Sequence, residues 1–541
     1  MLVALTLLVF GRIVSHDFVW DDDYTILTNP RLNPASLRTV LYYLTHAEFG
    51  LYIPLTYTGW VLLAIISSLV GQAAQGSALH PGVFHACSLV VHLASALVVC
   101  SILTRLVSVR WAAMAGAFIF AIHPIQVEAV AWASGLKDLL CGFFVLLMLR
   151  QYLVAWDFNA SRGANDLVST GSEKPSHPAR HLTLITLYFV CALLAKPAAV
   201  YAPLLIVVIH LWVIRRPLRP LVVPLLIWMS LAVGASLLGR HVQPAYEVWQ
   251  PPVWSRPLLA FDAIAFYITK TVFPLSLGVD YGRSPQHVFT SGTFYLSTCV
   301  TGTILLGLFL LRKQRPNLSW GACLFVIPLT PVLGFLPFLY QQYSTVADHY
   351  AYVSMLGISV MVSMCLARTH VRAWRFLTTA GVMILAGGSF VQAGTWRDSR
   401  SLFTHAFSVN PRSFMAASNL AATTMGEASP VESEHWSRQA IAIKPDYAPA
   451  YELLAKALFQ QGRRAEAVQA AEAAIARYQQ MPVVTRPDLS TLHVAIARQY
   501  VEMNQPAEAV SHLRASLEVR DDPAIRKMLG EIHSATRPSR P

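Results

Sequence analysis

Apolar runs of close to twenty residues recur along the first 394 residues of this 541-residue chain. A run of that length can cross the hydrocarbon core of a bilayer as a helix, which satisfies its own backbone hydrogen bonds there. The composition agrees, because 55% of the residues are hydrophobic and only 13% are charged, whereas about a quarter are charged in soluble domains. The sequence therefore predicts an all-α, multi-span membrane domain over residues 1–394.

Basic clusters at the ends of the runs set the expected orientation, since Lys and Arg concentrate on the cytoplasmic side. Every basic cluster lies on the cytoplasmic side if the chain crosses the bilayer about eleven times and if the apolar stretches 51–70 and 258–277 do not span it. The expected spans are residues 1–14, 83–103, 111–122, 139–155, 182–195, 198–214, 221–238, 293–311, 320–340, 350–367 and 376–394. The expected external loops are residues 15–82, 123–138, 239–292 and 341–349.

The net charge of +12 comes from short basic clusters between the apolar runs, a pattern typical of membrane topology rather than of a nucleic-acid site. The seven cysteines all lie in apolar segments and form no CxxC pair, so we interpret them as small core residues. The opening run 1–10 has no basic residues before it and no small-residue cleavage site, so a cleaved signal peptide is not expected.

After the last expected span the composition changes to Ala, Glu, Arg and Gln in a soluble helical pattern. The Ala-Ile pair at 440–441 recurs at 474–475, one 34-residue period later, and segment 462–467 recurs at 504–509, with about eight extra residues around 481–487. Helix pairs with this period are tetratricopeptide repeats, which stack into a solenoid. We therefore expect a repeat domain over 395–541, on the external side because an odd number of spans precedes it.

Three consecutive carboxylates, Asp21, Asp22 and Asp23, follow the first apolar run and lie where the chain leaves the bilayer. One interpretation is a capped or solvated loop without a chemical role. The other is a catalytic base, because a carboxylate partly removed from water holds a proton more tightly and is suited to take one from a hydroxyl. The aromatic residues that flank the cluster favour the second interpretation.

Other polar side chains lie where expected spans meet the external surface: His123, Glu128, Lys137, Asp138, Lys196, Asp262, Lys270, Asp348, His349 and Tyr350. Each alone is compatible with a snorkelling or capping residue, but ionisable groups gathered at one depth are costly and mark a site. Carboxylates beside lysines suggest an anionic substrate, such as a phosphate, next to a general base. The sequence contains no Gly-rich phosphate loop, Ser-His-Asp set or zinc spacing. Because the cytoplasmic loops are too short for a nucleotide-binding domain, a donor carried in the membrane fits better.

An ordered set of short motifs resembles the transmembrane and tetratricopeptide-repeat protein O-mannosyltransferases and their bacterial relatives. The motifs are Phe18–Asp23 with Asn29-Pro30, Tyr52–Leu55, His123–Trp132, Lys137–Leu139, Lys196-Pro197 and Ala347–Tyr352. The likeness runs over nearly the whole chain, including the repeats. It implies a C-type glycosyltransferase fold, a lipid-phosphate sugar used at the external face, and a juxtamembrane helix at 51–70.

The resemblance also implies roles for single residues. Asp21 would be the base that deprotonates the acceptor hydroxyl, with Asp22 as its neighbour, and Glu128 or Asp138 would supply a second acid. The residues expected at the donor phosphate and lipid head group are Lys137, Lys196, His123, Asp348, His349 and Tyr350. Two positions depart from the family pattern, because Ile53 and His349 stand where an arginine is usual. Arginine binds phosphate through two parallel hydrogen bonds that neither residue can reproduce.

The predicted function is the inverting transfer of a mannose-like sugar from a polyprenyl phosphate to a hydroxyl, with Ser or Thr of an exported protein as acceptor. The expected location is the bacterial inner membrane, with the repeats on the periplasmic side binding the acceptor protein. Two alternatives remain open, namely a glycan or lipid acceptor and a non-catalytic membrane scaffold. No metal ligand set is predicted, and the need for a divalent metal ion is left open.

Overall fold

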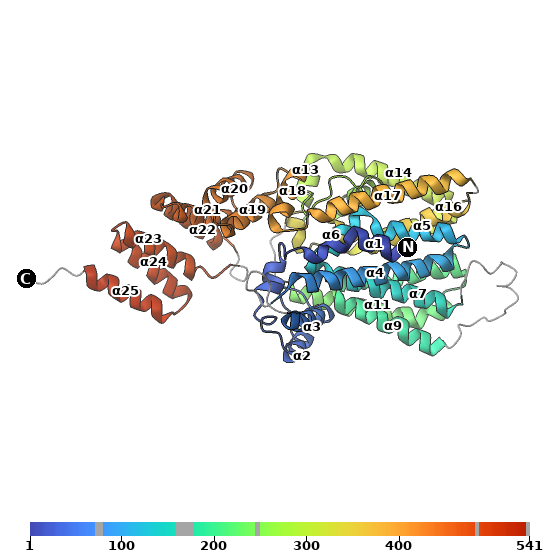
Figure 1. Cartoon of the computed structure of the whole chain (residues 1–541), viewed down its shortest axis with the longest axis horizontal. Coiled ribbons are helices and arrows are strands. Elements are labelled where there is room, and N and C mark those ends of the chain that lie inside the picture. The colour runs from blue at the N-terminus through green and yellow to red at the C-terminus, as the bar shows by residue number, and fades with distance from the viewer. Residues whose placement is uncertain (71–78, 158–177, 244–248, 370, 482–485, 537–541) are drawn as a thin grey trace, which may run out of the picture. The chain divides into compact units, whose positions relative to one another are not determined.

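The computed structural model describes residues 1–70, 79–157, 178–243, 249–369, 371–481 and 486–536 (Figure 1). Parts of the expected loops 15–82 and 239–292 therefore lie outside the described residues. The chain separates into two compact units, a membrane unit of residues 1–405 and a repeat unit of residues 406–541. The sequence had placed this boundary after Gly394.

The membrane unit is built from helices. Its α-helices are α1 (Leu2–Phe10), α2 (Leu37–Thr45), α3 (Pro54–Val70), α4 (Pro81–Leu106), α5 (Arg110–Ile122), α6 (Val127–Ala131), α7 (Leu136–Ala155), α9 (Pro178–Ala195), α10 (Ala202–Ile209), α11 (Val222–Val242), α12 (Arg256–Val272), α13 (Pro285–Ser291), α14 (Thr293–Leu311), α15 (Pro316–Val326), α16 (Met355–Ala367) and α17 (Arg372–Gly394), and α18 (Ser399–Val409) crosses into the repeat unit. Short 3₁₀ helices that carry site residues are η4 (Ala133–Gly135), η5 (Pro197–Tyr201), η9 (Ile327–Val332) and η11 (Asp348–Ala351). Within the described residues the extended pairings are two isolated β-bridges, so the predicted all-α fold is confirmed.

Among the described residues, six helical segments are long and apolar enough to cross a membrane: Pro81–Leu106, Ala133–Ala155, Pro197–Ile214, Arg219–Val242, Phe294–Leu311 and Arg372–Gly394. A seventh is formed if Arg110–Ile122 and Pro124–Ala131, which meet at a 44° bend, count as one broken span. The apolar helices Leu2–Ser15, Pro54–Val70, Ala179–Ala195 and Met355–Ala367 are shorter. The chain is thus a multi-pass membrane protein, while the number of eleven spans stays a prediction.

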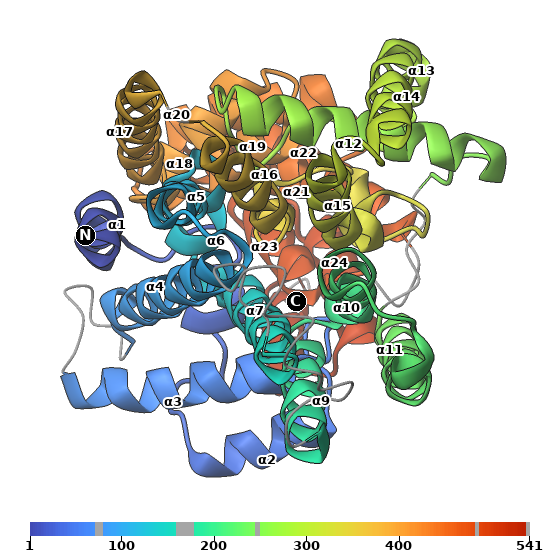
Figure 2. The same ribbon diagram turned by 90° about the vertical axis from the view of Figure 1, so that its right-hand side faces the viewer.

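The stretch 51–70 forms α3, which lies across the bundle. In Figure 2, which looks along the bundle, α7, α9 and α11 are seen end-on whereas α3 lies lengthwise across the view. This is the orientation expected of a helix that does not span. The hydroxyl of Thr56 on α3 donates to the carbonyl of Ala195 at the end of α9, with a distance of 2.9 Å. This bond fixes α3 to the end of the bundle that carries Lys196.

A hydrophobic cluster holds the segment that carries Asp21–Asp23, here called the acidic loop, against this end of the bundle. Ile26 and Leu32 of the loop pack there with Tyr57 of α3, Phe84 of α4 and Leu136 of α7. Burial of such side chains contributes about 1.5–3 kcal/mol each. The carboxylates that precede Ile26 are therefore attached to a packed core, although Asp21 and Asp22 lie outside the helices and Asp23 begins the short π-helix η2 (Asp23–Leu27).

The repeat unit is a series of antiparallel helix pairs. Its helices are α19 (Phe414–Gly426), α20 (Pro430–Ile443), α21 (Ala448–Gln460), α22 (Arg464–Gln479), α23 (Ser490–Glu502), α24 (Pro506–Val519) and α25 (Pro523–Thr536). Proline opens α20, α24 and α25, where its missing N–H costs nothing. The alanines at equivalent positions of the predicted repeats are all fully buried: Ala440 and Ala474, and Ala467 and Ala509. A side chain larger than alanine would not fit there, which explains the recurrence.

Candidate active site

Asp22 is a fully satisfied buried carboxylate. Its Oδ1 accepts hydrogen bonds from the backbone N–H of Ser134 at 2.8 Å and from the Ser134 hydroxyl at 2.5 Å. Its Oδ2 accepts from the backbone N–H of Val19 at 3.1 Å. Burial, and then the charge of Asp21, raise the pKa of Asp22 to about 7. Asp22 thus ties the acidic loop to η4, and its oxygens are already engaged by protein donors.

Asp21 has the opposite environment. It is partly buried, its Oδ1 is buried without a hydrogen bond of normal geometry among the described residues, and its Oδ2 receives a long bond of 3.5 Å from the Tyr24 hydroxyl. Burial raises the pKa of Asp21, and the positive charge of Lys137 and the nearby indole N–H of Trp132 oppose that rise. Asp23 is exposed. Among the three carboxylates, Asp21 is therefore the one with an oxygen left to accept a proton from a substrate.

Aromatic rings surround these carboxylates. Trp20 has a left-handed backbone conformation, with φ of 59°, and its ring stacks on Trp132 at 5.2 Å. A non-glycine residue in this region is uncommon, and such strain concentrates at functional sites. The ammonium of Lys137 lies 4.1 Å from the centre of the Trp132 ring and donates to the Ser134 carbonyl at 3.0 Å. The two tryptophans and the lysine hold the acidic loop against the segment 127–137.

The segment expected as external loop 123–138 is folded and buried. Every residue from Ile122 to Leu136 is buried, and the segment consists of short helices rather than an exposed loop. Within it, Glu128 accepts from the Nδ1–H of His349 at 2.9 Å and from the backbone N–H of His349 at 3.1 Å. Both oxygens of Glu128 are thus used to orient His349, which comes from η11. Glu128 is a positioning residue in this geometry, not a second acid facing substrate.

Asp138 and Lys196 form an ion pair at the wall of a small cavity. The Lys196 ammonium donates to Asp138 Oδ1 at 2.5 Å and lies 5.2 Å from the centre of the Tyr350 ring. The cavity, of about 30 Å³, is lined by Asp138, Lys196, His349 and Tyr350 among others. The sequence expected these four residues at one site, and the fold brings them together from α7, the start of η5 and η11.

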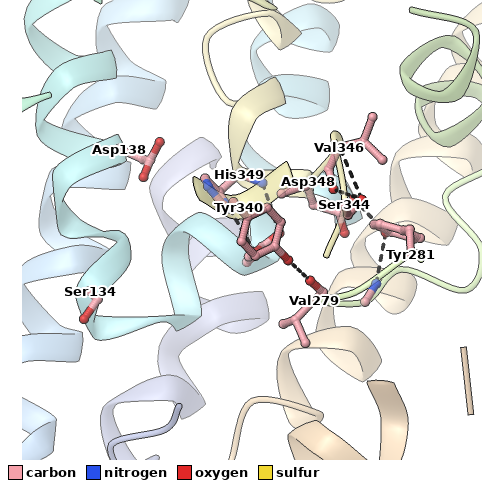
Figure 3. A network of polar contacts seen from close by, with 12 residues as sticks. Ser134, Asp138, Val279, Tyr281, Tyr340, Ser344, Val346, Asp348 and His349 are labelled. Carbon is pink, nitrogen blue, oxygen red and sulfur yellow. Dashed lines mark hydrogen bonds and ion pairs between the residues drawn. The ribbon is translucent and has the colours of Figure 1, made fainter. Parts of the chain in front are cut away.

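A second polar network lies beside this cavity (Figure 3). The Tyr281 hydroxyl donates to Asp348 Oδ1 at 2.7 Å, and the Tyr340 hydroxyl donates to the Val279 carbonyl. Burial and the charge of Glu128 raise the pKa of Asp348 well above its usual range. Asp348 is therefore held by a tyrosine and is not among the residues that line the cavity.

Two expected residues lie elsewhere. Both ring nitrogens of His123 are hydrogen-bonded to the backbone. Nε2–H donates to the Thr271 carbonyl at 3.0 Å, and Nδ1 accepts from the Ile125 N–H at 3.2 Å. No ring nitrogen is left over for a substrate. Ile53 is 1% exposed and packs in the hydrophobic cluster beside Tyr57. Its side chain faces the core rather than the cavity.

Sequence reasoning gave no role to Ser134 or Thr25. The Thr25 hydroxyl donates to the Asp21 carbonyl at 2.7 Å and lies 3.0 Å from the Ser134 hydroxyl. Small hydroxyl residues are common in loops, so no pattern distinguished these two. The contact spans 109 residues of sequence, and only the folded chain shows that it links the acidic loop to η4.

No metal centre is indicated by the side chains. Among the residues that the structure describes, no group of three or more His, Cys, Asp or Glu side chains is placed to hold a metal ion. The carboxylates are instead spread over separate partners, with Asp22 on Ser134, Glu128 on His349 and Asp138 on Lys196.

Comparisons with known proteins agree with the motifs. A tetratricopeptide-repeat family model matches residues 446–522. The human protein O-mannosyl-transferase TMTC1 is 28% identical over 203 residues, which cover 37% of this chain and 22% of that protein. Human TMTC4 is 26% identical over 178 residues, covering 30% and 24%, and mouse TMTC2 is 31% identical over 162 residues, covering 28% and 18%. The chain thus spans about a quarter or less of the length of these relatives.

The solved structure of Pseudomonas aeruginosa pilF is 22% identical over 29% of this chain and 66% of that chain, but its TM-score of 0.22 carries no argument. The resemblance indicated by the motifs is confirmed by the curated relatives. This chain is a multi-pass, all-α membrane protein that is similar to the TMTC protein O-mannosyl-transferases and that carries tetratricopeptide repeats in its C-terminal unit.

Proposed function

We propose that this chain is a membrane glycosyltransferase that moves a mannose-like sugar from a polyprenyl phosphate to a Ser or Thr hydroxyl of a protein. One observation carries the proposal: Asp21 Oδ1 is buried and makes no hydrogen bond of normal geometry to the described residues. The names of the similar proteins support the reaction class. A buried carboxylate with a raised pKa is suited to general-base catalysis.

In the proposed step, Asp21 takes the proton of the acceptor hydroxyl while the hydroxyl oxygen attacks the anomeric carbon of the sugar. The bond between that carbon and the phosphate oxygen breaks, and the lipid phosphate leaves on the opposite face with the bonding electron pair. The product is therefore inverted at the anomeric carbon. Phosphate is already a good leaving group, so the protein mainly positions the reactants and neutralises charge.

Lys137 is the proposed cation for the donor phosphate. Its ammonium is close enough to Asp21 to affect the pKa of that carboxyl, and it contacts the Ser134 carbonyl and the Trp132 ring rather than a carboxylate. Lys196, expected at the phosphate from the sequence, has its charge balanced by Asp138 at 2.5 Å. A cation that is not paired with a carboxylate is the stronger partner for an anion.

The acceptor protein is proposed to bind the repeat unit outside the cytoplasm, with the membrane unit in a bacterial inner membrane. Tetratricopeptide repeats present an extended concave surface that suits a peptide or protein. The positive-inside distribution of basic clusters puts the repeat unit on the external side.

The base is tested by turnover of the purified chain with polyprenyl-phosphate mannose and a peptide that contains Ser and Thr. Asp21→Asn keeps size and hydrogen bonding but cannot accept a proton, so turnover is expected to fall by roughly 10²–10⁴. Asp23→Asn, a change of the same kind in the same loop at an exposed position, is the matched control and should retain activity within about twofold. Full activity in Asp21→Asn would remove this carboxylate from the mechanism, and a scaffold role would then be favoured.

The topology is tested by reporter fusions after Gly394 and after residue 536. Both should be active as alkaline phosphatase fusions and dark as cytoplasmic fluorescent fusions, because both follow the last external exit. A fusion after Arg315, expected in the cytoplasm, gives the reverse pattern as control. Active alkaline phosphatase at Arg315 would invert the topology and place the candidate site on the wrong side for an exported acceptor.

A further inference from the structure

The small cavity lined by Asp138, Lys196 and His349 has room for a hydroxyl group. Its volume is about 30 Å³, and about 10–15 Å³ suffices to hold one water molecule. It lies between the start of α7, η5, η9 and η11.

Asp138 presents an unpartnered oxygen there. The residue is 7% exposed, and while Oδ1 accepts from Lys196, Oδ2 is buried with no hydrogen-bond partner among the described residues. A buried polar atom without a partner costs about 1–3 kcal/mol, so native structures rarely leave one unless a ligand or water completes it. Asp138 Oδ2 therefore calls for a hydrogen-bond donor.

His349 presents a ring nitrogen to the same cavity. Its Nδ1 lies 2.9 Å from Glu128 Oε1, and because a carboxylate only accepts, Nδ1–H is the donor in this bond. Nδ1 is therefore used by Glu128, and Nε2 is the ring nitrogen left for a ligand of the cavity that His349 lines. The orientation is set by Glu128, as in other carboxylate–histidine pairs.

The charges in the cavity wall distinguish between candidate ligands. Lys196 and Asp138 balance one another at 2.5 Å, and Asp138 still has an oxygen without a partner. A phosphate would bring a second anion against that oxygen. A hydroxyl donates its hydrogen to Asp138 and accepts from Lys196, which matches the wall in both directions.

The geometry points to a hydroxyl-reading subsite: the cavity formed by Asp138, Lys196 and His349 binds one hydroxyl group of the transferred sugar and thereby selects the sugar. This inference rests on the proposed function, since the sugar is that of the lipid-phosphate donor. It assigns to these residues the recognition of the sugar rather than of its phosphate. Glu128 acts through His349 and is a positioning residue.

The test uses the unchanged full chain with polyprenyl-phosphate mannose and its four monodeoxy analogues, each lacking one hydroxyl. Both binding, by calorimetry, and transfer to a peptide are measured. One analogue is expected to lose about 10²-fold or more in kcat/KM, because the hydroxyl that it lacks leaves buried polar groups of the cavity unpaired. The other three analogues should lose much less. The same analogue should show the weakest binding.

Asp138→Asn then identifies the residue. It should lower the ratio of kcat/KM for the mannose donor to kcat/KM for the discriminated analogue by tenfold or more, whereas Asp23→Asn should leave that ratio unchanged. If Asp138→Asn does not fold, the analogue series on the unchanged chain still decides. Equal binding and transfer of all five donors, or no binding of any of them, would overturn the subsite.

The outcomes also separate the inference from the reaction. Selective binding without any transfer would support the subsite and refute the glycosyl transfer. Transfer without selectivity would do the reverse, and the cavity would then hold only water. Tight binding of polyprenyl phosphate alone that is lost in Lys196→Met at a temperature where this variant stays folded, with no selectivity among the sugars, would place the phosphate in this cavity and contradict the inference.

Discussion

Charged side chains occupy two very different environments in the two units. Around the candidate site of the membrane unit the ion pairs are buried, as in Asp138 with Lys196, whose side chains are 7% and 18% exposed. In the repeat unit they lie on the surface of helices, as in Glu452 with Lys456, whose side chains are 29% and 53% exposed. Both pairs have short contacts, of 2.5 and 2.7 Å.

The difference teaches that a contact distance alone does not measure an ion pair. A buried pair has given up the hydration of both charges, so loss of one partner leaves a charge that neither water nor protein satisfies. An exposed pair loses little because water replaces the partner. The free-energy cost of burying charge is therefore larger for Asp138 and Lys196, at the candidate site of the membrane unit, than for Glu452 and Lys456 in the repeat unit.

The largest effect on stability is expected from Lys196→Met. Removal of the ammonium leaves the buried Asp138 carboxylate uncompensated, at a cost of about 3–5 kcal/mol in the free energy of unfolding. The same substitution at Lys456, whose partner is exposed, should cost less than about 1 kcal/mol. Thermal unfolding of the full chain in detergent measures both, and a double change of Lys196→Met with Asp138→Leu should recover most of the loss. Equal effects at the two lysines would break the comparison.

A pH dependence of stability is expected from Asp22. Burial and the charge of Asp21 raise the pKa of Asp22 from 3.8 to about 7, so the folded chain keeps this proton where the unfolded chain has lost it. The free energy of unfolding therefore falls as pH rises from about 4 to about 7, by at most about 1.4 kcal/mol per pH unit, and this contribution is flat above that range.

Asp22→Asn removes the titrating group, so the slope between pH 4 and 7 should become shallower even if the loss of the Ser134 contacts lowers stability throughout. Asp23→Asn, at an exposed position, is the control and should keep most of the slope. An unchanged slope in Asp22→Asn would contradict the assignment of this proton.

Smaller effects of opposite sign are expected from alanine at two glycines. A Cβ at Gly357 of α16 would lie 2.5 Å from the Gly321 carbonyl oxygen of α15, so Gly357→Ala should destabilise the membrane unit by about 1–3 kcal/mol. At Gly530 of α25 a Cβ meets nothing within 4 Å, so Gly530→Ala should stabilise its helix by up to about 1 kcal/mol. Thermal unfolding of the full chain with probes in each unit measures both. Destabilisation by both alanines would show that the two units are equally close-packed.

Much of the fold follows from local pattern. The apolar runs predicted membrane helices, and the 34-residue period predicted repeat helices whose matched alanines are buried in pairs. The position of Asp21–Asp23 after the first run predicted where a candidate base would lie. The sequence also grouped Asp138, Lys196, His349 and Tyr350 at one end of the molecule, and these four line one cavity.

Other features could not be read from the sequence, because each depends on which groups meet. Three adjacent aspartates are alike as letters, yet Asp22 is satisfied by Ser134, more than a hundred residues away, whereas Asp21 keeps a buried oxygen without a hydrogen bond of normal geometry among the described residues. His123 had a plausible role in the motifs, and Ile53 stands where the family pattern has an arginine, but the side chains of the two residues are used by backbone contacts and by the core. Segment 123–138 has the polarity of a loop and is nonetheless buried.

The sequence by itself determined the class of this protein: a helical membrane unit, a tetratricopeptide-repeat unit, and acidic and basic residues placed at helix ends. These are properties of hydrophobicity and period, which act over a few turns of chain. The tertiary structure alone decided the partners, such as Glu128 for His349 across 221 residues. Desolvation and hydrogen-bond geometry depend on every neighbour in space, so the identity of the unpaired carboxylate oxygens, and hence the candidate chemistry, is fixed only when the chain is folded.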